Sequence, residues 1–129
     1  EWYVLQCSIF NVGISIMNSE NKLKYDSSIS KLLENVKVDY NKFSTYEDGR
    51  VSFANGLTVK PGRKFDKVMN GSSVWGFIAK TDGVLKGIPY FVGDVFKAAS
   101  WRGPAKHVRG SIFSGKTDWF RWTGPRYLI

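Results

Sequence analysis

Closely spaced turn signals constrain the fold of this chain more than any other feature of its sequence. Through the middle of the chain, residue pairs that favour tight turns separate short segments rich in β-branched and aromatic residues. Antiparallel sheets are built in this way, whereas a doubly wound α/β fold needs longer strands that alternate with helices. The sequence therefore predicts a small β-rich α+β domain with a bent antiparallel sheet or a partial barrel. The turn pairs are Asp48-Gly49, Asn55-Gly56, Pro61-Gly62, Asn70-Gly71 and Asp82-Gly83.

The segments between these turns are the expected strands. The most apolar of them, Ser73–Ala79, is the expected central strand. Its Gly76 indicates a bulge or a place where another backbone approaches closely. Further strands are expected at residues 2–10, 14–17, 51–53, 64–68, 90–96, 111–113 and 118–122.

A single helix is expected before these turns begin. Four apolar side chains recur at i, i+3, i+4 and i+7, which places them on one helical face: Ile29, Leu32, Leu33 and Val36. The helix is expected to span about residues 28–37 and to pack on the sheet. The polar run 18–26 before it is expected to be a loop that ends in N-capping side chains. After it, Val38 and Tyr40 fit the alternation of a strand.

The remaining bulk properties limit the class of protein. With 129 residues and no linker or repeat, the chain is expected to form a single domain over residues 1–129. Cys7 is the only cysteine, so no internal disulfide can form and nothing requires an oxidising compartment. One cysteine and one histidine cannot build a zinc site of the usual ligands. No apolar run reaches the ~18–20 residues of a membrane span, and no glycine-rich nucleotide motif is present, so no cofactor is expected.

Charge is distributed unevenly along the chain. Residues 1–59 carry six Lys/Arg against seven Asp/Glu, whereas residues 60–129 carry thirteen against four. Such a concentration of positive charge indicates a surface that holds a polyanion. Nucleic acid is the expected partner, ahead of an anionic membrane surface or an acidic protein.

The densest part of this basic half is the ten-residue stretch Trp101–Gly110, which also contains the only histidine, His107. Pro104 suits the first position of a helix and Gly110 suits its end, so a short helical turn is expected between them. Cations that contact phosphates release counterions, and exposed aromatic rings stack on unpaired bases. The predicted nucleic-acid-binding residues are Trp101, Arg102, Lys106, His107, Arg109, Lys116, Trp119, Arg121 and Arg126.

The segment 119–122 adds one expectation about orientation. If it is a strand, Trp119 and Arg121 share one face and Phe120 and Trp122 share the other. Because a charged side chain favours the solvent side, the face of Trp119 and Arg121 is expected to be exposed. The choice between DNA and RNA and the oligomeric state are left open.

Catalysis by His107 is a second alternative to simple binding. A histidine beside Lys106 and Arg109 has the chemistry of a general acid or base in phosphodiester cleavage, with the cations stabilising the charged transition state. Such chemistry usually needs a second base or a carboxylate. The sequence does not place Asp94 or Asp118 near the histidine, so binding without turnover is the preferred prediction.

The segments Gly93–Gly110 and Trp122–Leu128 resemble short uncharacterised proteins encoded by bacteriophages. The resemblance covers roughly the last 50 residues. It implies a viral accessory protein in the cytoplasm of an infected bacterium, and it brings no activity or catalytic residues. The first alternative function is therefore a protein–protein interaction module, such as an inhibitor of a host factor or a virion component. Its basic face would contact an acidic protein, with Trp or Tyr residues as hot spots.

Overall fold

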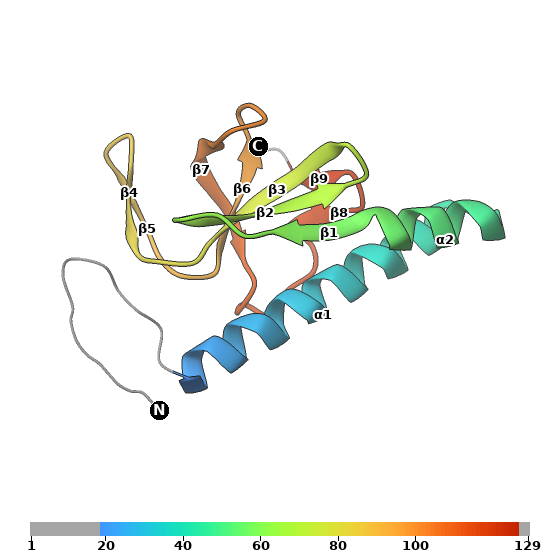
Figure 1. Ribbon diagram of the computed structural model, residues 1–129, viewed down its shortest axis with the longest axis horizontal. Helices are drawn as coiled ribbons and strands as arrows, with labels where there is room; N and C mark the ends of the chain where they lie inside the picture. Colours follow the sequence, from blue (N-terminus) through green and yellow to red (C-terminus); the bar gives the residue numbers. More distant parts are fainter. Residues whose placement is uncertain (1–18, 127–129) are drawn as a thin grey trace.

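The computed structural model describes residues 19–126, which form two helices and a set of antiparallel strands (Figure 1). The expected strands at 2–10 and 14–17, and Cys7, lie outside the described residues. The fold is α+β and rich in strands, as the turn spacing predicted. The helices are α1 (Ser19–Phe43) and α2 (Glu47–Gly56).

Helix α1 is longer than predicted at both ends. The residues expected to form a loop at 18–26 and a strand near Val38 belong to this helix from Ser19 onward. The apolar face extends one turn before Ile29 with Tyr25, which is fully buried, and one turn beyond Val36 with Tyr40. When the apolar face of a helix packs along its whole length, the polar residues on the opposite face are held in the helical conformation as well.

Helix α2 replaces a predicted hairpin. Asp48-Gly49 and Asn55-Gly56 were expected to be tight turns around a strand at 51–53, and this prediction is wrong. The reason is tertiary packing, because Phe53 is buried and stacks on the Tyr40 ring with 4.1 Å between centroids. Two acidic residues also occupy the first turn of α2, where the helix dipole favours negative charge.

Five antiparallel strands form the main sheet, in the order β1-β2-β3-β6-β7, and this sheet is not closed into a barrel. Two small two-stranded sheets, β4-β5 and β8-β9, are separate from it. Figure 1 shows the β4–β5 hairpin projecting from the end of the sheet opposite α2. The strands are β1 (Leu57–Lys60), β2 (Phe65–Asn70), β3 (Ser73–Ala79), β4 (Gly83–Leu85), β5 (Ile88–Tyr90), β6 (Asp94–Ala98), β7 (Pro104–Ser111), β8 (Phe120–Arg121) and β9 (Gly124–Pro125).

Strand β3 confirms the predicted central strand and the reason for its glycine. A Cβ at Gly76 would lie 2.9 Å from the carbonyl oxygen of Phe96, so only glycine fits against the neighbouring strand. The predicted strand 90–96 is instead two strands, because Gly93 adopts a φ of 91° between β5 and β6. Such a left-handed conformation interrupts the extended backbone.

The predicted helical turn between Pro104 and Gly110 is wrong, since these residues belong to β7. Strand β7 is at the edge of the sheet, where a proline at the first position is tolerated. Gly110 does not end a helix; a Cβ there would lie 2.3 Å from the ring of Trp119, so the glycine makes room for an aromatic side chain. The two late strands are shorter than expected, since 112–113 form a turn and only Phe120–Arg121 pairs as β8.

The two faces of the main sheet are packed differently. Helix α1 covers one face, where Leu32 and Val36 join Ile78 and Val95 in the larger core cluster. The other face carries a smaller cluster of buried residues, to which the β4–β5 hairpin contributes Tyr90. No helix of the described residues belongs to this second cluster, so part of that face is left for solvent or a ligand.

Candidate nucleic-acid interface

A row of directly opposed side chains crosses the sheet on the face away from α1. Directly opposed residues of antiparallel strands project to the same face. The charged end of the row is at β1 and the apolar end is at β7, where Val108 packs with the smaller core cluster. The row consists of Lys60, Lys67, Phe77, Phe96 and Val108.

A hollow of about 470 Å³, called here the basic groove, opens at the charged end of this row. Its walls come from β1, from the β1–β2 loop and from the β6–β7 turn, and two phenylalanine rings contribute apolar surface. Five cations and no acidic residue line it among the residues that the structure describes. The lining residues are Lys60, Pro61, Gly62, Arg63, Lys64, Phe65, Lys67, Phe77 and Arg102.

The β6–β7 turn holds Trp101 beside this groove. The backbone N–H groups of Ala99 and Ser100 both donate to the carbonyl oxygen of Gly103, at 3.0 and 3.3 Å. The Trp101 side chain is 51% exposed, and the Lys67 Nζ lies 4.1 Å from its ring centroid. A cation at this distance is attracted to the negative face of the ring. The turn therefore places a half-exposed aromatic ring and a guanidinium, that of Arg102, at one site.

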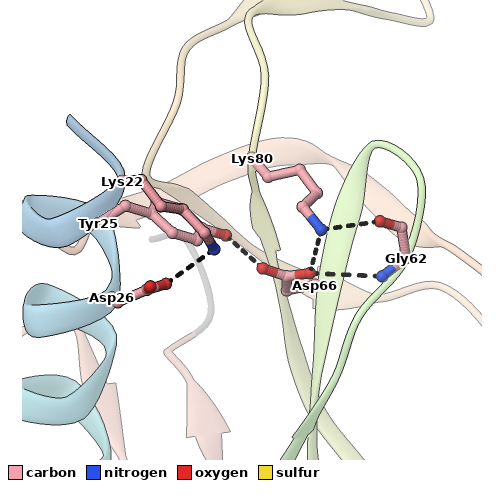
Figure 2. Close-up of polar contacts among 6 residues, drawn as sticks. All are labelled: Lys22, Tyr25, Asp26, Gly62, Asp66 and Lys80. Carbon is pink, nitrogen blue, oxygen red and sulfur yellow. Dashed lines mark hydrogen bonds and ion pairs between the residues drawn. The ribbon is translucent and has the colours of Figure 1, made fainter. Parts of the chain in front are cut away.

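The β1–β2 loop is held from behind by a buried carboxylate, as Figure 2 shows for Tyr25 and Lys80 converging on Asp66. Asp66 is 5% exposed and accepts the Tyr25 hydroxyl at 2.8 Å. Its other oxygen pairs with Lys80 Nζ at 2.9 Å and accepts the Gly62 N–H at 3.3 Å. Lys80 Nζ also donates to the Gly62 carbonyl oxygen at 3.0 Å. These contacts fix the loop that carries Arg63.

The Asp66 network also sets the electrostatics of the loop. Burial, and then the negative charge of Asp66, raises the pKa of the Tyr25 hydroxyl far above its ordinary value, so this hydroxyl remains a donor. Lys80 balances the charge of Asp66 at the back of the loop. The groove cations are therefore not neutralised by the acidic residue that is closest to them in sequence.

The structure brings only two of the predicted binding residues to this groove, Trp101 and Arg102. Lys106 and His107 are exposed on the edge strand β7 but do not line the groove. Lys116 lies on the other side of the molecule, beside Lys31 of α1 in a small hollow of about 50 Å³. Clustering in the sequence therefore does not correspond to a single surface.

The arginines near the C-terminus contact the protein itself. Arg109 Nη1 donates to the carbonyl oxygen of Arg126, and Arg126 Nη1 donates to that of Asp118, both at 3.1 Å. Arg121 Nη1 lies 3.9 Å from Oδ1 of Asp39, a residue of α1. We refer to Arg109, Arg121 and Arg126 as the C-terminal arginines. Burial, and then the positive charge of Arg109, lowers the pKa of Lys97 nearby.

The Trp119 ring packs against the protein and is only partly exposed to solvent. The ring lies against Gly110, and its centroid is 4.7 Å from that of the Phe120 ring. The indole N–H donates to the Lys116 carbonyl oxygen at 3.0 Å. Arg121 is exposed and Phe120 is buried, as the alternation predicted, but Trp119 is partly covered. This ring therefore offers less surface to a ligand than Trp101 does.

His107 has no partner for acid–base chemistry in the part of the chain that the structure describes. Neither a hydrogen bond nor an ion pair joins it there to a carboxylate. Within residues 19–126, no three His, Cys, Asp or Glu side chains come together as metal ligands would. Neither α1 nor α2 combines the length and the apolar character that a helix needs to cross a membrane.

Most of the groove cations were missed from the sequence, although a signal for them exists. Lys60, Arg63, Lys64 and Lys67 lie within eight residues around the predicted Pro61-Gly62 turn. The strands that flank such a turn must pair, which brings the charges at their ends together. A charge run that spans a turn therefore predicts a local patch better than one that continues along the chain.

Comparison with curated proteins and with solved structures found no significant match. The resemblance to short bacteriophage proteins stays a prediction. A family described as a family of unknown function (DUF7717) matches residues 15–127, which are 113 of the 129 residues and include the groove, Trp101 and the Asp66 network. The chain thus belongs to the DUF7717 family.

Proposed function

We propose that this protein binds nucleic acid in the basic groove. The observation that carries the proposal is the composition of the groove: within residues 19–126, five cations and no acidic residue surround one hollow beside a half-exposed tryptophan. Phosphates neutralise such a surface, and an aromatic ring beside it suits a nucleobase. The cations are Lys60, Arg63, Lys64, Lys67 and Arg102.

Repulsion within the groove supports an anionic ligand. Lys60 and Lys67 are directly opposed on β1 and β2, and like charges in such a pair destabilise a sheet. The Trp101 ring compensates for part of this repulsion, since the two Nζ atoms lie 6.0 and 4.1 Å from its centroid. A bound phosphate would reduce the remaining repulsion, so relief of this repulsion would contribute to the binding energy.

Binding of this kind is mainly electrostatic and weakly dependent on sequence. Arg63 and Lys64 are exposed on a loop that the Asp66 network holds in place, so little backbone entropy is lost when they contact a phosphate. Trp101 would stack on a base through the part of its ring that solvent reaches. Stacking accepts any base, because every base has an aromatic face.

The double variant Arg63→Ala/Lys64→Ala tests the proposal, with labelled single- and double-stranded DNA and RNA followed by anisotropy at several salt concentrations. We expect affinity to fall roughly 10- to 100-fold at low salt. The slope of log affinity against log salt should decrease by about 1.4–1.8, because each lost phosphate contact removes ~0.7–0.9. Arg102→Ala should weaken binding to all sequences alike.

The matched control is Lys37→Ala/Lys42→Ala, which removes the same charge from α1. If both double variants weaken binding equally, only the net charge matters and the groove is not the interface. If the wild-type protein binds none of the nucleic acids at low salt, the proposed function is wrong.

A protein partner is the second candidate, and one observation favours it. Phe43, Tyr46 and Val51 lie near the α1–α2 connection and are 67, 70 and 50% exposed. Exposed apolar residues close together in the chain are typical of protein contact surfaces. Oligomers or complexes in sizing experiments, together with a failure to retain nucleic acid, would favour this function.

A further inference from the structure

A second hollow of about 350 Å³ adjoins the basic groove at the β1–β2 loop. The two hollows share Arg63 and Lys64, so one extended ligand that crosses the loop can reach both. The chemistry of the second hollow is different, because it contains a carboxylate, a hydroxyl and apolar surface. Its other lining residues are Thr81, Asp82, Gly83, Val84 and Tyr90.

We propose that the second hollow binds an unpaired nucleobase that carries an exocyclic amino group, with Asp82 as the acceptor. This inference rests on the proposed function, since the base belongs to the strand whose phosphates lie at Arg63 and Lys64. The two cations of the hollow, Arg63 and Lys64, hold the strand's phosphates, and a second phosphate placed against Asp82 would be repelled by its carboxylate. A nucleobase carries no charge. Its aromatic face can contact the apolar surface of the hollow, and its polar edge can bond to the carboxylate and the hydroxyl.

Asp82 is held in a position that suits this role. Its Oδ1 accepts the Val92 N–H at 2.9 Å, which orients the carboxylate, and the side chain is exposed on the hollow. An ionised carboxylate only accepts hydrogen bonds, and its second oxygen can accept the amino group of a base. Asp and Glu are the usual acceptors for the cytosine amino group in protein–DNA contacts. Thymine and uracil present a carbonyl oxygen at the same position, which Asp82 would repel.

The remaining lining gives the hollow an aromatic floor and an apolar rim. Tyr90 is buried, and its hydroxyl oxygen lies so close under Gly83 that a Cβ there would be 2.5 Å away. Val84, on the projecting β4–β5 hairpin, is 66% exposed at the rim. The volume lies within the ~300–1,000 Å³ of small-ligand sites. A base can enter a hollow of this size only after it has left its stack, so the ligand is an unpaired strand.

The experiment compares oligocytidylate with oligothymidylate of equal length, by anisotropy, for the wild type and Asp82→Asn. We expect the wild type to bind the cytosine strand at least roughly fivefold more tightly, as one good contact to a base edge provides. In Asp82→Asn the amide oxygen can still accept the Val92 N–H, while the amide N–H groups can donate to thymine. The preference should therefore fall to about twofold or less, or reverse, as expected for this exchange of donors.

Glu34→Gln is the matched control, since it removes one acidic charge from the exposed side of α1 and should leave the preference unchanged. Equal affinity of the wild type for both strands would overturn the inference, even if binding still depends on Arg63 and Lys64. Equal tightening of both strands in Asp82→Asn would overturn it too, because Asp82 would then act only as a charge. Failure of every strand to bind at low salt would instead overturn the proposed function itself.

Discussion

The basic groove and the C-terminal arginines both concentrate positive charge, but they differ in what their donors contact. Two of the C-terminal arginines, Arg109 and Arg126, donate to backbone carbonyl oxygens, and the third, Arg121, lies near Asp39. In contrast, none of the five groove cations is joined to a carboxylate by an ion pair among the described residues. The groove cations are therefore available to an anion, whereas the C-terminal arginines stabilise loops of the protein itself.

The position of Asp66 explains part of this difference. Asp66 lies behind the β1–β2 loop, where Lys80 and Tyr25 occupy its oxygens. The loop backbone at Gly62 is bound to the same group. A basic surface is thus defined by where the acids and the free carbonyl oxygens lie, as much as by where the cations lie.

The largest effect on this comparison is expected from Asp66→Ala, which removes the anchor of the loop. The free energy of unfolding should fall by about 3 kcal/mol, because the charge of Lys80 and the hydroxyl of Tyr25 lose their partner. Binding should weaken as well, since Arg63 is no longer held. Urea denaturation measures the first effect, and anisotropy at a temperature where the variant is folded measures the second.

Asp26→Ala is the control for this variant. Asp26 pairs with Lys22 on the exposed side of α1, with 3.0 Å between Lys22 Nζ and Asp26 Oδ1, and such pairs contribute about 0.5 kcal/mol or less. If Asp66→Ala costs no more stability than Asp26→Ala, the buried network does not hold the loop. The Asp66 network would then not explain why the groove cations and the C-terminal arginines differ.

The second largest effect is expected from Trp101→Ala, which removes the aromatic ring beside the groove and leaves all five groove cations in place. Binding of single strands should lose about 1–3 kcal/mol, the usual contribution of one stacked base. The free energy of unfolding should change little, because the ring is half exposed. Calorimetric titration and quenching of tryptophan fluorescence in the wild type measure the contribution.

Tyr46→Ala is the matched variant, since Tyr46 is an exposed aromatic residue far along the chain from the groove. It should leave binding unchanged. Equal losses in the two variants would mean that Trp101 has no special place in the interface, and the aromatic part of the proposed function would be wrong.

The smallest effect is expected from Arg126→Ala. Removal of its hydrogen bond to the Asp118 carbonyl oxygen should lower the free energy of unfolding by about 1 kcal/mol. Affinity for nucleic acid should change by less than about twofold beyond the loss of one distant charge. Thermal unfolding and the same binding titrations test this. A loss of affinity as large as that of Arg63→Ala/Lys64→Ala would show that the two regions form one interface.

The candidate site was only partly predictable. Trp101 and Arg102 were identified from the sequence because they stand out in a basic, aromatic stretch. The four cations from Lys60 to Lys67 were missed, although they flank the predicted Pro61-Gly62 turn. That they lie beside Trp101 and Arg102 depends on tertiary structure, because the two segments are about 40 residues apart in the chain. Arg109 and Arg126 carry the same charge as Arg102, but they lie outside the groove and donate to carbonyl oxygens of the protein, which the sequence does not reveal.

What the sequence determined by itself is the local part of the fold. Antiparallel strands, the limits of β3 and the apolar face of α1 follow from turn residues and side-chain periodicity, which act within a few residues. The tertiary structure decided the rest. Phe53 is helical because Tyr40 stacks on it, Gly110 lies in a strand beside the Trp119 ring, and the groove keeps its charge because Lys80 and Tyr25 hold Asp66 behind the loop. Each of these depends on a partner distant in the sequence, and local propensity is too weak to outweigh the packing of such partners.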